Sequence, residues 1–168
     1  MNRLLKLTGF FMMTLVIFSA CNRDKKEAEE NYRTLSAIND SLYYYGEAWT
    51  DHLPDAVNHK DFTTLGTLRQ EAEAFVDRKL EYVRNMEEDA NVTPLKKAEI
   101  NYLLLEKEII HEGFGRFEMF SDTTSNEEIS DAYAGLLAMI EQEEEEQQRL
   151  RTAFKQYAEE YNIKTDKE

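Results

Sequence analysis

The longest helical pattern of the chain lies in residues 126–161, which read NEEISDAYAGLLAMIEQEEEEQQRLRTAFKQYAEEY. This stretch contains no proline, and Ser125 with Glu128 makes the capping-box pattern that starts a helix. Its core-facing candidates recur at alternating steps of four and three, which is the heptad seam of a helix packed lengthwise on other helices. Glu143 and Gln147 are the polar interruption of this seam. The seam positions are Ile129, Tyr133, Leu136, Ile140, Glu143, Gln147, Leu150, Phe154, Tyr157 and Tyr161.

Three further segments upstream have the same helical period. They are residues 27–53, 61–88 and 94–120. In the first, one apolar stripe consists of Leu35, Ile38, Leu42, Tyr45, Trp49 and Leu53. Pro54 lacks the backbone N–H that a helix interior needs, so it is expected to end or kink this helix. Residues 54–60 would then form a turn or a short extra helix.

Local signals mark the starts and one weak point of the middle helices. Asp61 is a plausible N-cap of the second helix. Thr93 followed by Pro94 is the clearest helix start, since proline fits the first helical position. Gly113 and Gly115 interrupt the third helix, where they indicate a loosened turn, a close helix contact or a hinge.

Together these segments predict an all-α protein whose residues 27–168 form a four-helix up-down-up-down bundle with long helices. Only six glycines and two prolines occur in 168 residues, which agrees with long helices. The helix over 126–161 is the longest, so we expect it to overhang its partners or to pack against another copy in a homo-oligomer.

The first 21 residues have the organisation of an export signal. Arg3 and Lys6 are followed by an uncharged run over 7–20, which is shorter than the roughly 20 apolar residues that span a membrane. Residues 17–21, Ile-Phe-Ser-Ala-Cys, resemble the lipobox of bacterial lipoproteins. The resemblance implies cleavage before Cys21, lipid on its thiol and acylation of the new amino terminus. An uncleaved anchor and ordinary secretion are the alternatives.

This resemblance predicts the cellular address. Residues 1–20 would be a signal peptide, and residues 21–30 would be the acylated cysteine with a charged tether. The bundle would be held in the cell envelope, at the outer membrane, facing the periplasm or the cell surface. The acidic residues of the tether are similar to surface-export signals of some bacterial lipoproteins; a solvated helix start is the alternative.

Charge restricts the partners of the chain. The formal net charge is −14, and loss of Arg3 and Lys6 with a signal peptide would make it −16. A surface this acidic repels nucleic-acid backbones and anionic headgroups. We therefore expect no nucleic-acid binding, and membrane attachment only through lipid on Cys21.

Few residues suggest chemistry. Glu108 and His111 have the Glu-x-x-His spacing of carboxylate-bridged metal bundles, but no second such pair occurs, so no metal site is predicted. The run Glu-Gln-Glu-Glu-Glu-Glu-Gln-Gln over 141–148 is expected to be a solvated face, with weak cation collection or partner docking as alternatives. No catalytic constellation or cofactor motif is found. The chain is therefore expected to be neither an enzyme nor a cofactor protein.

The densest aromatic patch is Tyr43, Tyr44 and Tyr45 with Trp49. Three successive helical positions span about 200° of the helix circumference, so at least one ring must be exposed. Tyr and Trp dominate binding hot spots, which makes Tyr43, Tyr44 and Trp49 the candidate partner-binding residues. Packing of these rings at a bundle edge is the alternative. The functional hypothesis is a lipid-anchored, non-catalytic interaction bundle; the alternative is a bundle that binds a metal ion or small ligand.

Overall fold

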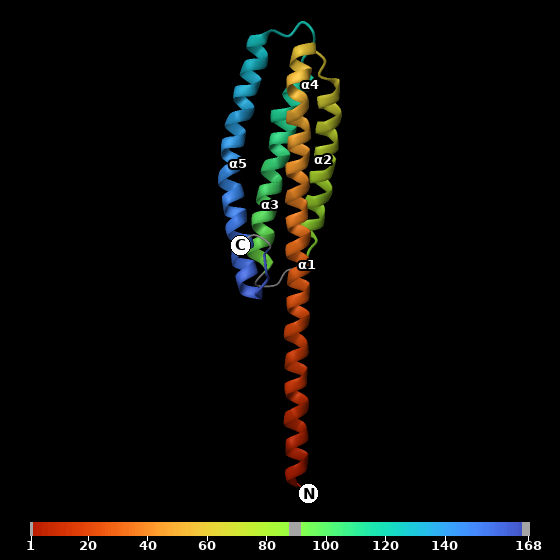
Figure 1. Ribbon diagram of the computed structural model, residues 1–168, viewed down its shortest axis with the longest axis vertical. Helices are drawn as coiled ribbons and strands as arrows, with labels where there is room; N and C mark the ends of the chain where they lie inside the picture. The colour runs from red at the N-terminus through yellow and green to blue at the C-terminus, as the bar shows by residue number, and fades with distance from the viewer. Residues whose placement is uncertain (1, 88–91, 166–168) are drawn as a thin grey trace.

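The computed structural model describes residues 2–87 and 92–165, with side chains from residue 25 onward. Four helical rods make up the bundle (Figure 1): α1 (Asn2–His59), α2 (Thr63–Arg84), a composite third rod and α5 (Asn126–Tyr161). The third rod consists of α3 (Val92–Glu108), the π-helix η1 (Ile109–Phe114) and the short α4 (Gly115–Glu118). Successive rods run in opposite directions, which confirms the predicted all-α up-down-up-down bundle.

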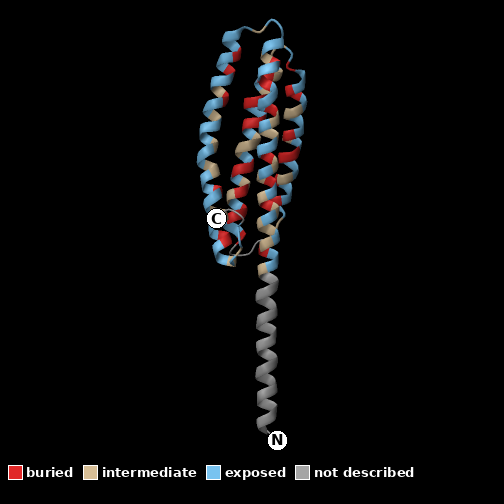
Figure 2. Ribbon diagram, in the orientation of Figure 1, coloured by how far each residue is buried: buried red, intermediate tan, exposed pale blue. Residues whose placement is uncertain are grey.

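The rods are arranged so that α1 and α3 face each other diagonally. Each rod packs on its two neighbours in the cyclic order α1, α2, α3, α5, and α1 with α5 is the least closely packed of these pairs. Each of the four rods carries buried residues in its described part (Figure 2). The core centres on Trp49, whose ring stacks on Phe114 at 4.0 Å and meets Phe117 edge-on at 5.2 Å.

Of the two predicted outcomes at Pro54, an end and a kink of the helix, the end is wrong, because α1 does not stop there. It continues to His59, and Leu53 and Ala56 on either side of the proline are both buried in the core. Tertiary packing therefore outweighs the lost backbone hydrogen bond. The turn comes at Lys60, whose φ is 55°, and the Asp61 N–H donates to Ala56 O at 3.1 Å in a Schellman-type closure. The C-terminal part of the predicted tether is part of α1, and Ala28 in this part is buried.

Two predicted helix starts are displaced. The helix α2 begins at Thr63, and Asp61 assists from outside the helix by accepting the Thr63 N–H at 3.1 Å. The helix α3 begins at Val92, so the prediction of Thr93 as its cap is wrong. Val92 is 1% exposed, and its burial between the helices explains why the helix starts before the local Thr-Pro signal.

The third rod widens into the π-helix at the two glycines. A π turn holds more residues than an α turn, so the neighbours Ile109 and Ile110 are both buried. A Cβ added to Gly113 would lie 2.8 Å from Leu136 Cδ1 on α5. The predicted loosened turn and close helix contact are thus both present, and Gly113 is the residue that allows α5 to approach.

The helix α5 has the predicted bounds. The Ser125 side chain accepts the Glu128 N–H at 3.2 Å, and Glu128 Oε2 accepts the Ser125 N–H at 2.9 Å, which confirms the capping box. The seam is less regular than predicted, because Tyr133 and Ile140 are exposed and no α5 residue between Leu136 and Leu150 is buried.

The predicted signal peptide and the lipidation site at Cys21 lie outside the described side chains. Within the described residues, none of the helices combines the length and the apolar character needed to cross a membrane.

Candidate functional site

The most unusual feature of the core is a polar pair that joins the two diagonal helices. Asn39 of α1 donates from Nδ2 to Glu99 Oε2 of α3 at 3.2 Å. Glu99 is 0% exposed, and burial raises the pKa of its carboxyl from 4.5 to about 8, an effect that the bond from Asn39 only partly offsets. Glu99 is therefore protonated at neutral pH.

Protonation explains two atoms that otherwise have no partner. Asn39 Oδ1 and Glu99 Oε1 are buried without a hydrogen bond among the described residues, and both are acceptors when the carboxyl is ionised. A proton on Glu99 Oε1 makes it a donor toward the Asn39 carboxamide oxygen. The pair then becomes a reciprocal acid–amide pair, which is the arrangement that a buried carboxyl needs.

A second polar group lies further along α3, within two turns of Glu99. The Tyr102 hydroxyl donates to Glu143 Oε1 of α5 at 3.0 Å, and Glu106 lies against both side chains. Burial, together with the neighbouring Glu143 carboxylate, raises the pKa of Glu106. Burial and these two carboxylates hold the pKa of Tyr102 well above its ordinary range. Glu106 therefore favours its protonated form.

These groups hold protons but form no recognisable catalytic arrangement. The Asn39–Glu99 pair contains no nucleophile. The Tyr102 hydroxyl donates to the Glu143 carboxylate, but Tyr102 is buried, with only 6% of its surface exposed. Within residues 25–87 and 92–165, no three His, Cys, Asp or Glu side chains are grouped so that they could hold a metal ion.

The Glu108–His111 half-motif does not form a pair in the structure. His111 Nδ1 lies 3.0 Å from Glu73 Oε1 of α2, and Glu108 is exposed. Glu73 also contacts Arg69, which reaches Glu118 of α4. Burial disfavours ionisation of Glu73, but its bonds with His111 and Arg69 outweigh this effect and hold its pKa below its usual value. The network joins the second and third rods at the surface.

The aromatic patch separates into surface and core. Tyr43 is 72% and Tyr44 is 71% exposed, whereas Tyr45 packs on Phe75 of α2 with ring centroids 5.1 Å apart. Trp49 is 1% exposed. Its inclusion among the surface-binding candidates is therefore corrected: it is the centre of the core, and only Tyr43 and Tyr44 are available at the surface.

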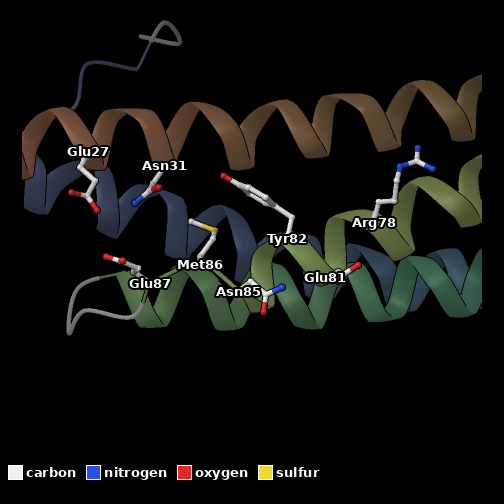
Figure 3. A pocket seen from close by; sticks show the side chains of 8 residues that line it. All are labelled: Glu27, Asn31, Arg78, Glu81, Tyr82, Asn85, Met86 and Glu87. Carbon is white, nitrogen blue, oxygen red and sulfur yellow. The ribbon is translucent and has the colours of Figure 1, made fainter.

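A groove lies between α1 and the C-terminal end of α2, at the end of the bundle that contains Glu27 (Figure 3). Its volume is about 640 Å³. Glu27, Glu81 and Glu87 place carboxylates around it, and Tyr82 provides an aromatic wall. The groove could accept a small organic cation.

Sequence reasoning missed the fully buried Glu99 and the half-buried Glu106 on the inner side of α3. Two sets of positions fit the helical spacing equally well. Positions 95, 99, 102, 106 and 109 include Glu99 and Glu106, and positions 95, 98, 102, 105 and 109 include Ala98 and Leu105 instead. Hydrophobicity favoured the apolar alternative. The structure places Glu99 fully inside, with Ala98 only half-buried.

The chain matches no protein-family model, no curated protein and no solved structure.

Proposed function

We propose that the chain is a lipid-anchored lipoprotein of the cell envelope whose helical domain binds a protein partner and performs no catalysis. The observation that carries the proposal is the exposure of Tyr43 and Tyr44, at 72% and 71%, on a helix whose other face is fully packed. Large aromatic side chains left this accessible are the residues most often found at the centre of protein interfaces.

The position of the tyrosines supports a protein partner over the membrane itself. Tyr43 lies 18 residues after Lys25, which corresponds to about 27 Å of α-helix. An anchor at Cys21 would hold the near end of the bundle at the membrane, so both rings would be well clear of the headgroups. The acidic character of the chain also disfavours contact with an anionic lipid surface.

The lipid anchor is tested by replacing Cys21 with Ala. We expect the wild-type protein to incorporate labelled palmitate and to fractionate with membranes, and the variant to lose both properties. A variant that remained in the membrane fraction would contradict the anchor. Protease treatment of intact and lysed cells then distinguishes a surface location from a periplasmic one.

The interaction is tested by placing a photo-crosslinking amino acid at Tyr44 in living cells. A matched control carries the same group at Tyr82, an exposed tyrosine of α2. The proposal expects a discrete crosslinked band from position 44 that is absent from position 82. Equal patterns from both positions, or no band at position 44, would contradict it.

Binding of a small ligand is the second candidate, and the groove of Figure 3 is the observation that favours it. Its test is an NMR titration of the protein with small amines that carry an aromatic or apolar part. Saturable chemical-shift changes should centre on Tyr82 and Met86. Changes spread evenly over the bundle would indicate only general attraction to an acidic protein.

A further inference from the structure

Charge is distributed unevenly around the bundle. Residues 34–59 of α1 and 126–148 of α5 contain twelve Asp and Glu and no Lys or Arg. By contrast, α2 carries four acidic and four basic residues. Since α1 and α5 are neighbours, their outer surfaces make one strongly acidic side of the molecule, here called the α1–α5 face.

The same face carries an apolar row that no element covers. Tyr133, Leu137 and Ile140 follow one another on α5 at steps of four and three, and all three are exposed. At one end of the row, Ile129 and Tyr133 line a hollow of about 500 Å³ together with Leu53 and other α1 residues. The row therefore continues into a recess between the two helices.

Tyr43 borders this row from the α1 side. Tyr32 of α1 meets Phe154 of α5 with ring centroids 5.2 Å apart, so Tyr32 marks the side of α1 that faces α5. Tyr43 follows eleven residues later, which is about three helical turns, and it therefore lies on that same side. Nothing lies within 4 Å of where a Cβ on Gly46 would be, so the space beside it is open.

An acidic residue lies one helical turn after three of the apolar residues of the face. Glu47 follows Tyr43 by four residues, and Glu141 and Glu144 follow Leu137 and Ile140 by four. All three carboxylates are exposed. None of them takes part in an ion pair among the described residues, whereas Glu145 and Glu146 further along α5 are held by Arg149.

We infer that the α1–α5 face docks a basic amphipathic helix supplied by the partner protein. This inference rests on the proposed function and specifies the chemistry of its partner. The apolar side of the docked helix packs on the exposed Leu137 and Ile140 of α5. Its Lys and Arg residues pair with the exposed carboxylates next to this row, beginning with Glu141 and Glu144.

A helix suits this surface better than an extended segment does. The apolar residues of the face form a straight row along the bundle, with spacing that matches the i, i+4, i+7 positions of an opposing helix. The exposed carboxylates Glu141 and Glu144 continue along the same stripe of α5, and Glu47 lies on α1. A helix with one apolar stripe bordered by basic residues complements both features at once, and like charges on an acidic helix would be repelled.

The test uses the full chain in nanodiscs of neutral phosphatidylcholine and a synthetic, fluorescent Leu/Lys amphipathic helix as the probe. Fluorescence anisotropy measures its dissociation constant, with empty nanodiscs as the blank. A peptide with Glu in place of every Lys has the same apolar stripe and should not bind. Raising the salt concentration should weaken binding of the Lys peptide, because the flanking pairs are exposed.

Matched variants locate the binding surface. Leu137→Ser and Leu104→Ser remove leucines that are equally exposed, at 43%, but Leu104 is on α3. Losing the contact of one leucine that becomes buried on docking should weaken binding about tenfold for Leu137→Ser and leave Leu104→Ser unchanged. Glu141→Lys with Glu144→Lys should likewise weaken binding, whereas the same reversal at exposed Glu71 and Glu108 should do so much less.

Equal losses from both faces, or binding of the Glu peptide, would overturn the inference. The proposed function is judged separately by the crosslink at Tyr44. A discrete crosslinked partner combined with face-independent peptide binding would leave the interaction domain standing and reject the basic helix. Circular dichroism of every variant confirms that the bundle is intact before binding is compared.

Discussion

Replacing Glu99 with Gln should remove much of the pH dependence of stability. The carboxyl is fully buried, and its only hydrogen bond among the described residues comes from Asn39. Gln has the shape of the protonated acid, and its amide can donate to Asn39 Oδ1 while its oxygen accepts from Nδ2. The variant thus keeps the acid–amide geometry but cannot ionise.

The direction and size of the change in unfolding free energy follow from the pKa of Glu99. It rises from 4.5 to about 8 on folding, so between these values the folded chain binds more protons than the unfolded chain. Stability from this carboxyl is therefore complete below pH 4.5 and is lost as the pH rises toward 8. The loss is about 1.4 kcal/mol per pH unit, or about 5 kcal/mol over the whole interval as an upper limit. At pH 7, Glu99→Gln should be about 3 kcal/mol more stable than wild type.

The assay is urea denaturation of residues 22–168, followed by circular dichroism at 222 nm between pH 5 and pH 8. The quantity compared is the difference in unfolding free energy between variant and wild type at each pH. This difference should be small at pH 5 and should grow with pH. Glu108→Gln, at an exposed position of the same helix, removes one carboxylate without changing the core and serves as the control.

Parallel stability curves for wild type and Glu99→Gln would refute the reasoning. They would mean that Glu99 titrates alike in the folded and unfolded chains, which requires access of water to a side chain that is completely buried here. A difference that shrank with pH would contradict the sign. Asn39→Leu gives a second check, since it removes the bond that partly offsets the raised pKa of Glu99 and should extend the pH dependence of stability to higher pH.

Four further substitutions should alter stability in distinct ways. Gly113→Ala places a Cβ 2.8 Å from Leu136 Cδ1 and should destabilise the bundle by about 1 kcal/mol in urea denaturation. Gly46→Ala has open space beside it and should stabilise the bundle by roughly 0.5–1 kcal/mol in the same assay. Trp49→Ala should cost about 3–5 kcal/mol by emptying the aromatic core, measured as a lower melting temperature. Ser125→Ala should cost about 1 kcal/mol by removing the α5 cap, with increased amide exchange in the first turn.

The features that could be predicted from the sequence are those with local causes. The helix α5 begins where Ser125 and Glu128 cap it and ends at Tyr161, as its uninterrupted pattern indicated. The number of helices and their antiparallel order follow from four amphipathic segments with short connections. In these places, propensity, capping and hydrophobic period all favour the same structure.

Predictions failed where packing outweighed a local signal. Pro54 is a helix breaker in isolation, but Leu53 and Ala56 gain burial only if α1 continues through it. Thr93 is a good cap, but Val92 is buried as the first residue of α3. Trp49 had two conflicting predictions: its place in the apolar stripe of the first helix correctly predicted burial, and its grouping with the exposed tyrosines as a binding residue was wrong. The six-residue step from Tyr43 turns it toward the core.

The buried carboxyls were missed for a different reason. Two sets of positions on α3 share the seam spacing, and only the positions of the other helices decide between them. The sequence contains both Ala98 with Leu105 and Glu99 with Glu106 at equivalent steps. The partner that makes Glu99 tolerable is Asn39, sixty residues away on the diagonal helix, and no local pattern connects the two.

The Asn39–Glu99 pair is better explained by specificity than by stability. Apolar stripes on helices that lie lengthwise can match again after a shift of one turn, about 5.4 Å, with little change in buried area. Such a shift between α1 and α3 would separate Asn39 from Glu99 and leave two polar side chains buried without partners. Each would cost about 1–3 kcal/mol, which is enough to disfavour the shifted register strongly. Replacing both residues with Leu should therefore retain the helices but broaden their side-chain signals, because several registers would then have similar energy.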